Sequence, residues 1–281
     1  MTPEVWPAPA KINLFLHVLG RRADGYHRLQ TLFQFLDYGD ELRFRLREDG
    51  QIRRSAGPVD IPEDSDLAIR AARALRADCA GRQGVDIAVH KRTPTGAGLG
   101  GGSSDAATVL VALNQLWGCG LDAGRLAAIG LKLGADVPVF VRGLAAWAEG
   151  VGEELTPVVL PEPWYVVLVP PVHVATAAVF GAPELKRDSA PISLADYLAG
   201  AGHNDCTAVT AVRYPLVAEA LRWLEVRGLD ARMSGTGGAV FAACGDEQLA
   251  RATVGAAPTE WRGFAARGLN VSPLAAIIRA A

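Results

Sequence analysis

Cysteine is scarce in this chain, and the spacing of its few cysteines forms no known motif. The 281 residues contain four of them, far apart in the sequence: Cys79, Cys119, Cys206 and Cys244. No two form a Cys-x-x-Cys pair, which argues against a zinc site or a dithiol redox centre. We therefore expect four free thiols, as in proteins of a reducing cytoplasm.

The sequence also lacks an excess of charge and a long hydrophobic run. The 28 Lys and Arg against 30 Asp and Glu give a formal net charge of -2, which is too small to hold the chain on nucleic acid or an anionic membrane. The first ten residues lack the basic and apolar regions of a secretory signal. The most apolar stretch, residues 164–180, is interrupted by Pro170, Pro171 and His173 and is too short to span a bilayer. The composition predicts a cytoplasmic protein that binds neither nucleic acid nor membrane. The sequence leaves open whether it is a monomer or a homodimer.

The hydrophobic content and the glycines point to a folded protein with special loops. Half of the residues are hydrophobic and 21% are charged, so the chain can bury a core of one or two domains. Its 31 glycines gather at residues 96–102 and 235–238. Clustering of this kind predicts loops that need an open backbone.

Hydrophobic periodicity predicts mixed strands and helices along the whole chain. We expect strands at 10–19, 29–36, 41–47, 85–90, 144–149, 156–169, 229–234, 238–244 and 263–269. We expect helices at 66–78, 103–117, 122–133, 205–212, 215–227 and 246–254. The proline-rich segment 170–204 resembles a lid or connector. The order predicts an α+β or α/β fold with two halves that meet near residue 155 and share an interface.

The segment 94–110, PTGAGLGGGSSDAATVL, is the most informative local pattern. A strand enters it and a helix leaves it, so Ser103 or Ser104 is expected to cap that helix, whose free N–H groups favour an anion. The segment lacks the Gly-Lys-Ser/Thr of a Walker loop. It matches the dinucleotide pattern G-x-G-x-x-G, but the acid about twenty residues on, Asp122, follows a helix instead of ending a strand. A phosphate-binding loop is the better interpretation.

Three segments together resemble the GHMP kinase superfamily: residues 9–14 (PAKINL), residues 94–110 and residues 234–241 (SGTGGAVF). They occur in the order of that family. The resemblance implies a two-domain α+β GHMP kinase fold, with a ribosomal protein S5 domain 2-like N-terminal domain at residues 1–155 and a ferredoxin-like C-terminal domain at residues 156–281. It also implies ATP as the phosphoryl donor and Mg²⁺ as its companion.

Two longer segments, residues 7–40 and 134–155, narrow the resemblance to members that phosphorylate the tertiary 2-hydroxyl of a cytidine-diphosphate-linked methylerythritol. The resemblance assigns catalysis to Lys11 and Asp136. A carboxylate beside the hydroxyl accepts or orients its proton, and an ammonium stabilises the developing charge. From the residues alone, Asp136 could instead cap a turn before Val-Pro, and Lys11 could be a solvated strand lysine.

The resemblance also assigns the substrate side. Asn13 shares a strand face with Lys11 and either binds substrate or holds Lys11 in place. Aromatic rings stack on pyrimidines, so the cytidine end is expected to meet aromatic and polar groups. The expected substrate-binding residues are Asn13, Tyr26, His27, Phe33, Thr176, Phe180, Gly235, Thr236 and Gly237. Taken singly, each aromatic could equally be a core residue.

For ATP, the resemblance names the glycine loop and two flanking positions. The expected residues are Lys91, Pro94, Thr95, Gly96, Ala97, Gly98, Leu99, Gly100, Gly101, Gly102, Ser103, Ser104 and Asp66. Aspartate stands at position 66 where the family has asparagine, so the amide donor is lost and adenine recognition is in doubt. The sequence identifies no protein ligand of Mg²⁺; Ser103, Ser104 and Asp136 are all open.

Three other functions are compatible with parts of the sequence. Another GHMP kinase acting on a smaller alcohol would not need the aromatic residues. A nicotinamide oxidoreductase could use the glycine loop. A nucleotide-binding module without catalysis could keep the same scaffold, because fold does not fix function.

Overall fold

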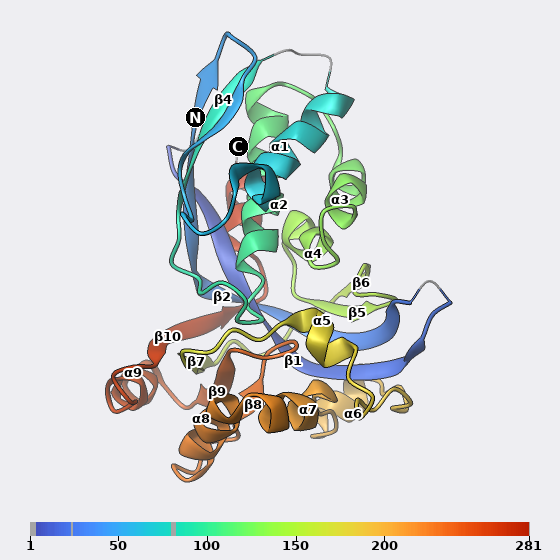
Figure 1. Ribbon diagram of the computed structural model, residues 1–281, viewed down its shortest axis with the longest axis vertical. Helices are drawn as coiled ribbons and strands as arrows, with labels where there is room; N and C mark the ends of the chain where they lie inside the picture. The colour runs from blue at the N-terminus through green and yellow to red at the C-terminus, as the bar shows by residue number, and fades with distance from the viewer. Residues whose placement is uncertain (1–3, 24, 80–82, 281) are drawn as a thin grey trace.

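The computed structural model describes residues 4–23, 25–79 and 83–280. It is an α+β molecule whose strands join in one ten-stranded sheet, with helices packed on it (Figure 1). The strand order is β3-β4-β2-β10-β7-β9-β8, with β1 and β5 also paired to β2 and β6 paired to β5. A sheet in which distant strands are neighbours confirms the mixed fold class.

A long antiparallel hairpin, β1 (Trp6–Arg21) and β2 (His27–Arg47), runs through both halves of the molecule. The sequence predicted two strands at 29–36 and 41–47, and this was wrong, because the structure joins them. Residues between them stay paired with β1, as Gly39 with Pro9 and Asp40 with Ala8. Pairing with β1 therefore keeps the strand continuous through Gly39 and Asp40, two residue types that are rare in strands.

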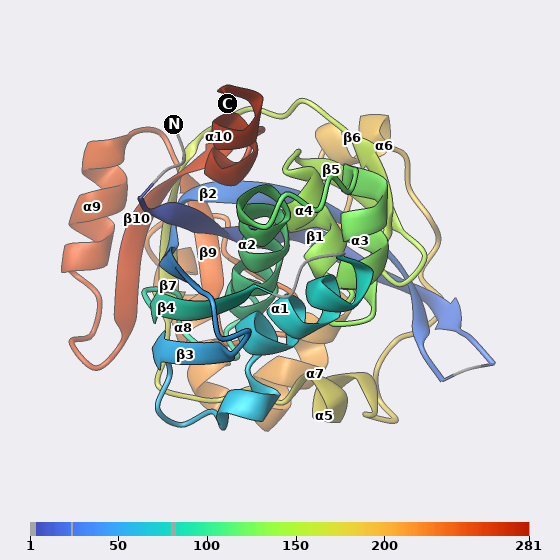
Figure 2. The ribbon, with the colours of Figure 1, turned by 90° about the horizontal axis from the view of Figure 1, so that it is seen from above.

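The N-terminal half packs four helices against the sheet. These are α1 (Leu67–Asp78), α2 (Gly101–Leu116), α3 (Ala123–Leu131) and α4 (Val137–Arg142), with strands β3 (Ile52–Ala56), β4 (Gly84–His90), β5 (Ala146–Glu149) and β6 (Glu154–Pro157). A short 3-10 helix, Glu63–Ser65, precedes α1. Seen from above, α2 lies among α1, α3 and α4 (Figure 2).

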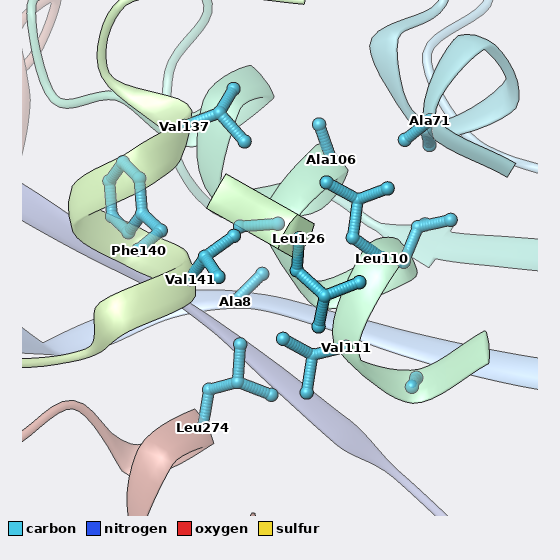
Figure 3. Close-up of a cluster of buried hydrophobic side chains, with 14 of the residues drawn as sticks. Ala8, Ala71, Ala106, Leu110, Val111, Leu126, Val137, Phe140, Val141 and Leu274 are labelled. Atoms are coloured by element: carbon cyan, nitrogen blue, oxygen red, sulfur yellow. The ribbon is translucent and has the colours of Figure 1, made fainter. Parts of the chain in front are cut away.

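Small and branched side chains on α2 make this packing possible. Ala106, Leu110 and Val111 are buried and meet Phe140 of α4 and Leu274 of the last helix, α10 (Pro273–Ala280) (Figure 3). The helices predicted at 66–78, 103–117 and 122–133 are confirmed. The sequence analysis missed α4 and α10, because a six-residue helix and a chain end carry little periodicity.

The C-terminal half has the βαββαβ order of a ferredoxin-like unit. It comprises β7 (Trp164–Val169), α5 (Thr176–Phe180), α6 (Leu194–Leu198), α7 (Cys206–Arg213), α8 (Pro215–Glu225), β8 (Arg232–Met233), β9 (Val240–Cys244), α9 (Glu247–Gly255) and β10 (Arg262–Leu269). Its strands lie in the order β10-β7-β9-β8, with α8 and α9 packed on them. The predicted ferredoxin-like half is confirmed.

A shared core joins the two halves. Along β7, Val166 and Leu168 pack toward the C-terminal helices. The alternate residues Tyr165, Val167 and Val169 pack into a cluster with Ile12 and other residues of the β1–β2 hairpin. Because both faces of the sheet are buried, the halves meet across apolar surface, as the sequence predicted; the exact boundary near residue 155 stays a prediction.

Three backbone segments meet closely at the junction of the halves. The glycine loop lies between β1 and the loop at 234–239. On one side, the Leu99 carbonyl accepts a hydrogen bond from the Lys11 N–H at 3.0 Å. On the other, the Ala97 carbonyl accepts one from the Ala239 N–H at 2.9 Å. A Cβ on Gly98, which has a φ of 75°, would lie 2.2 Å from the Ser234 carbonyl oxygen. Only glycine fits at this point.

The start of α2 differs from the predicted serine cap. The N-cap is Gly100, in the left-handed conformation at φ 71° and without a side-chain hydrogen bond. Ser103 and Ser104 lie one turn inside the helix, so neither caps it. The glycine loop turns into the helix earlier than expected, because Gly100 adopts a conformation that a serine would resist. The first N–H groups of α2 are therefore left without a side-chain acceptor.

The expectation of four free cysteines was wrong for two of them. Cys79 and Cys119 form a disulfide, with their Cα atoms 5.2 Å apart, whereas Cys206 and Cys244 are free and buried. The two bonded residues follow the C-terminal ends of α1 and α2, which pack side by side. Their separation of 40 residues hides a proximity that only helix packing creates. Among the described residues, no helix has the length and apolar character to cross a membrane.

Replacing Gly98 by alanine is expected to weaken the whole fold. The left-handed conformation costs about 1–2 kcal/mol with a Cβ, and the clash with Ser234 adds a further loss of about 1–3 kcal/mol. Gly118 is the matched control, because its φ is 66° and its Cβ would meet nothing within 4 Å. Urea unfolding should show a larger loss for Gly98→Ala than for Gly118→Ala. Equal losses would contradict the close backbone contact.

The disulfide is expected to stabilise the protein by about 4 kcal/mol, because it closes a loop of about 40 residues in the unfolded chain. Reductant should lower the urea midpoint of the native protein and leave that of a Cys79→Ala/Cys119→Ala variant unchanged. Thiol labelling of the denatured, unreduced chain should modify two cysteines. Modification of all four would refute the bond.

Candidate active site

A cavity of about 720 Å³ opens beside the glycine loop, between the two halves. It is bounded by β1, β2, the residues before α4, α5 and the loop at 235–236. Among the residues predicted for the site, those that line the cavity are Lys11, Asn13, Tyr26, His27, Phe33, Gly98, Ser103, Asp136, Thr176, Phe180, Gly235 and Thr236. The structure thus brings the predicted catalytic residues, and all the predicted substrate residues except Gly237, together from four distant stretches of sequence.

Lys11 and Asp136 meet on one wall of this cavity. The Lys11 Nζ lies 3.2 Å from the Asp136 Oδ2, and the lysine side chain is 3% exposed against 34% for the aspartate. The same ammonium donates to the Asn13 Oδ1 at 2.5 Å and to the Gly98 carbonyl at 3.2 Å. The lysine is therefore buried and fully partnered, which excludes a solvated strand lysine.

Asp136 precedes α4 without capping it. It is the N-cap residue by position, but its side chain makes no cap hydrogen bond, and its carboxylate reaches Lys11 instead. The alternative of a turn-capping aspartate therefore fails. A partly exposed carboxylate paired with a buried ammonium is suited to receive a proton or to orient a hydroxyl.

Asn13 is held in turn by Thr31, a residue that the sequence analysis missed. The Asn13 Nδ2 donates to the Thr31 Oγ1 at 2.9 Å, and that hydroxyl donates to the Phe15 carbonyl. A register shift between Asn13 and Leu16 makes this contact possible. No sequence pattern reveals it, because β-bulges break the simple alternation of faces.

The third of the three resemblance segments, residues 234–241, contains the second group of glycines and is called the third glycine segment. It is fixed from outside the cavity. Asn204 Nδ2 donates to the carbonyls of Met233 and Gly235, and Thr210 Oγ1 donates to the Thr236 carbonyl. The Thr236 hydroxyl lies 3.0 Å from the Thr176 hydroxyl at the start of α5.

One predicted member of this segment lies elsewhere. A Cβ on Gly237 would face Thr210 at 2.7 Å, and Gly237 does not line the cavity. It serves the close packing of the loop on α7.

The far end of the cavity is aromatic. The rings of His27 and Phe180 stack with centroids 5.2 Å apart, and Tyr26, which is 63% exposed, lines the same end. Burial lowers the pKa of His27, and the positive charges of Arg187 and Arg21 lower it further. Arg187, also missed by the sequence analysis, donates from its Nε to the His27 Nε2 at 3.1 Å. The structure therefore places Tyr26, His27 and Phe180 together at this end of the cavity.

The other predicted nucleotide residues do not line this cavity, although some of them, such as Thr95 and Gly96, are exposed elsewhere on the loop. They are Asp66, Lys91, Pro94, Thr95, Gly96, Ala97, Leu99, Gly100, Gly101, Gly102 and Ser104. Lys91 is engaged elsewhere, since its Nζ lies 2.5 Å from the Asp40 Oδ2 and 2.7 Å from the Asp105 Oδ2. Burial raises the pKa of Asp105 to about 7, although Lys91 opposes the shift.

Asp66 is also committed to structure. Its Oδ1 caps α1 by accepting from the Ala68 N–H at 2.9 Å, and its Oδ2 pairs with Arg54 at 2.8 Å. The family has asparagine at this position, and the negative charge that aspartate adds here is paired with Arg54. Both carboxylate oxygens thus take part in holding the start of α1.

The described residues contain no cluster of three or more His, Cys, Asp and Glu suited to a metal ion. The oxygen donors that face the cavity near the glycine loop are the Ser103 hydroxyl and the Asp136 carboxylate. This donor set is too small for a resident metal and fits an ion that arrives with phosphates, because Mg²⁺ is commonly bound by one or two protein oxygens plus substrate phosphates.

Both halves of the chain match known protein families. Residues 66–144 match the GHMP kinases N terminal domain, and residues 182–262 match the GHMP kinases C terminal domain. The first match includes the glycine loop and Asp136. The second includes Arg187 and the third glycine segment.

Whole proteins match along nearly the full chain. The 4-diphosphocytidyl-2-C-methyl-D-erythritol kinase of Halorhodospira halophila is 57% identical over 273 residues, which are 96% of this chain and 94% of that protein. The protein of the same name from Alkalilimnicola ehrlichii is 56% identical, covering 98% and 94%. A crystal structure of 4-(cytidine 5'-diphospho)-2C-methyl-D-erythritol kinase superposes with a TM-score of 0.80 at 37% identity, over 94% of this chain and 98% of that one. This chain belongs to the GHMP kinase family.

Proposed function

We propose that this chain is an ATP-dependent kinase that phosphorylates the 2-hydroxyl of 4-diphosphocytidyl-2-C-methyl-D-erythritol to the 2-phosphate, in the non-mevalonate route to isoprenoid precursors. The observation that carries the proposal is the Lys11–Asp136 pair, 3.2 Å apart, in a cavity with the glycine loop on one wall and an aromatic end. A phosphoryl donor and a nucleotide-bearing alcohol need these three features side by side. The relatives at 56–57% identity carry the name of this activity.

The transfer step is assigned to two side chains. Asp136 accepts or orients the proton of the attacking hydroxyl, and Lys11 stabilises the negative charge on the transferring group. The buried environment of Lys11 supports this role, because its three partners hold the ammonium in one place and little of it is solvated. Fixed charges stabilise a transition state better than mobile ones do.

The phosphates are assigned to the glycine loop and the start of α2. Gly98 and Ser103 line the cavity, and α2 begins at a glycine without a side-chain cap, so its N–H groups are open to an anion. Mg²⁺ would contact the Ser103 hydroxyl and the Asp136 carboxylate, and it would neutralise charge on the β- and γ-phosphates.

The cytidine end is assigned to Tyr26, His27 and Phe180. A pyrimidine between aromatic rings gains stacking energy of about 1–3 kcal/mol. The methylerythritol portion would then extend along Thr176 and Thr236 toward Lys11. A kinase for a small alcohol would have no use for this aromatic end, which favours the nucleotide-linked substrate.

The experiment that tests the function is ADP release with ATP, Mg²⁺ and 4-diphosphocytidyl-2-C-methyl-D-erythritol. Mevalonate, homoserine and galactose serve as alternative acceptors. Turnover confined to the cytidine substrate is expected. Turnover with another alcohol would indicate a different GHMP kinase, and tight ATP binding without turnover would leave a nucleotide-binding module.

Asp136→Asn is expected to lower kcat by about 10²–10⁴-fold with a small change in KM, because the amide cannot accept the hydroxyl proton. Asp122→Asn is the matched control. Asp122 caps α3 through the Arg125 N–H, asparagine caps equally well, and the residue lies outside the cavity. Steady-state kinetics of both variants give the comparison. A kcat retained in Asp136→Asn would assign Asp136 to positioning alone.

A further inference from the structure

Arg187 forms a hydrogen bond with one ring nitrogen of His27, a residue that lines the aromatic end of the cavity. Its guanidinium lies in the segment after α5 and makes four hydrogen bonds. It donates to the His27 Nε2 at 3.1 Å and to the carbonyls of Leu185, Phe180 and Ala182 at 3.0, 2.9 and 2.6 Å. The same side chain thus fixes the backbone of the stacking ring Phe180 and one ring nitrogen of His27.

The chemistry of this contact settles the protonation of His27. A guanidinium has only donors, so the His27 Nε2 must present its lone pair to Arg187. A neutral imidazole carries its single proton on the other nitrogen, which here is Nδ1. A cationic ring would place an N–H against the guanidinium, and the positive charges of Arg187 and Arg21 oppose that form. His27 is therefore a fixed Nδ1–H donor.

A fixed donor distinguishes the two common pyrimidines. Cytosine presents the acceptors O2 and N3 side by side, whereas uracil carries a proton on N3. A histidine free to exchange tautomers could serve either base, as donor to cytosine or as acceptor from uracil. A site built around a buried hydrogen-bonding group discriminates strongly, because the wrong ligand leaves that group unpaired.

We propose that Arg187 is a positioning residue for base specificity: by holding the Nε2 of His27 it makes Nδ1–H a fixed donor, and the site then selects cytosine over uracil. This inference rests on the proposed function only in placing the pyrimidine at the aromatic end. It needs no phosphoryl transfer, so binding measurements test it separately.

A merely structural role of Arg187 predicts a different outcome. Three of its four hydrogen bonds hold the turn after α5, and their loss would displace Phe180 and weaken both pyrimidines alike. The proposed role predicts that the ratio of the two affinities changes. Arg213 is a suitable control, because it also holds an α5 carbonyl, that of Ala178, and pairs with Glu184 without touching His27.

The test is calorimetric binding of cytidine 5'-diphosphate and uridine 5'-diphosphate to the native chain, Arg187→Met and Arg213→Met. The native chain and Arg213→Met should prefer the cytidine ligand by about tenfold or more, the value of one well-matched base contact. Arg187→Met should bring this ratio close to one. An unchanged ratio in Arg187→Met, or a native chain that binds both ligands equally or neither, would overturn the proposal.

Nitrogen NMR of the histidine rings gives a second readout. Its first measurement is made on the native Arg187 chain and needs no arginine variant. The native His27, assigned by the loss of its signals in His27→Phe, should show a protonated Nδ1 and an unprotonated Nε2. Arg187→Met should gain the Nε2–H form and raise the pKa of His27 toward its ordinary value. A native His27 protonated on Nε2 would overturn the proposal even if Arg187→Met failed to fold.

The kinase assay separates the two hypotheses. Turnover of the cytidine substrate with an unchanged base ratio in Arg187→Met would leave the proposed function standing and refute the role of Arg187. A base ratio that falls as expected in a chain without turnover would support the role of Arg187 and refute the kinase function.

Discussion

The close backbone contact at Gly98 is the constraint on which the rest of the site depends. The Leu99 carbonyl accepts a hydrogen bond from β1, and the Ala97 carbonyl accepts one from the third glycine segment. Gly98 is the single residue between these two. Between them the Gly98 carbonyl accepts from Lys11 and from Ser234. Because no side chain fits at this point, the two halves approach until the backbone itself forms the wall of the cavity. Lys11 is thereby tied to both glycine segments.

That contact also explains how an ammonium can lie buried beside an active cavity. Burial of a charge is costly unless each of its hydrogen bonds is satisfied. Lys11 meets this condition with a carbonyl, an amide oxygen and a carboxylate. Asn13 and Thr31 extend the arrangement into the β1–β2 hairpin. The ammonium therefore faces the cavity with its position fixed before any ligand arrives, which is the property that electrostatic catalysis requires.

The aromatic end of the cavity is assembled from segments that are far apart in the sequence. Its residues come from the turn between β1 and β2, from the start of β2 and from α5, so it is completed only when the proline-rich connector folds back over the hairpin. The hydrogen bonds of Arg187 join the two sides. Lys91 differs from Lys11 in its role. Its ammonium pairs with Asp40 of β2 and Asp105 of α2, and it thereby links these two elements. Of the two lysines that the resemblance assigns to the site, Lys11 lines the cavity and Lys91 does not.

The sequence by itself determined the features that depend on neighbouring residues. The glycine loop followed by a helix and the order of strands and helices were predictable, because local conformation leaves a pattern at short range. The residues Lys11, Asp136, Tyr26, His27 and Phe180 were named by the resemblance of their segments to a known family. Their roles in catalysis and binding stay predictions. Contacts between distant segments leave no such pattern, and tertiary structure alone decided them. The continuity of β2, the Cys79–Cys119 bond, the glycine start of α2, and the positions of Thr31 and Arg187 each depend on which surfaces pack together, and packing is settled only when the whole chain has folded.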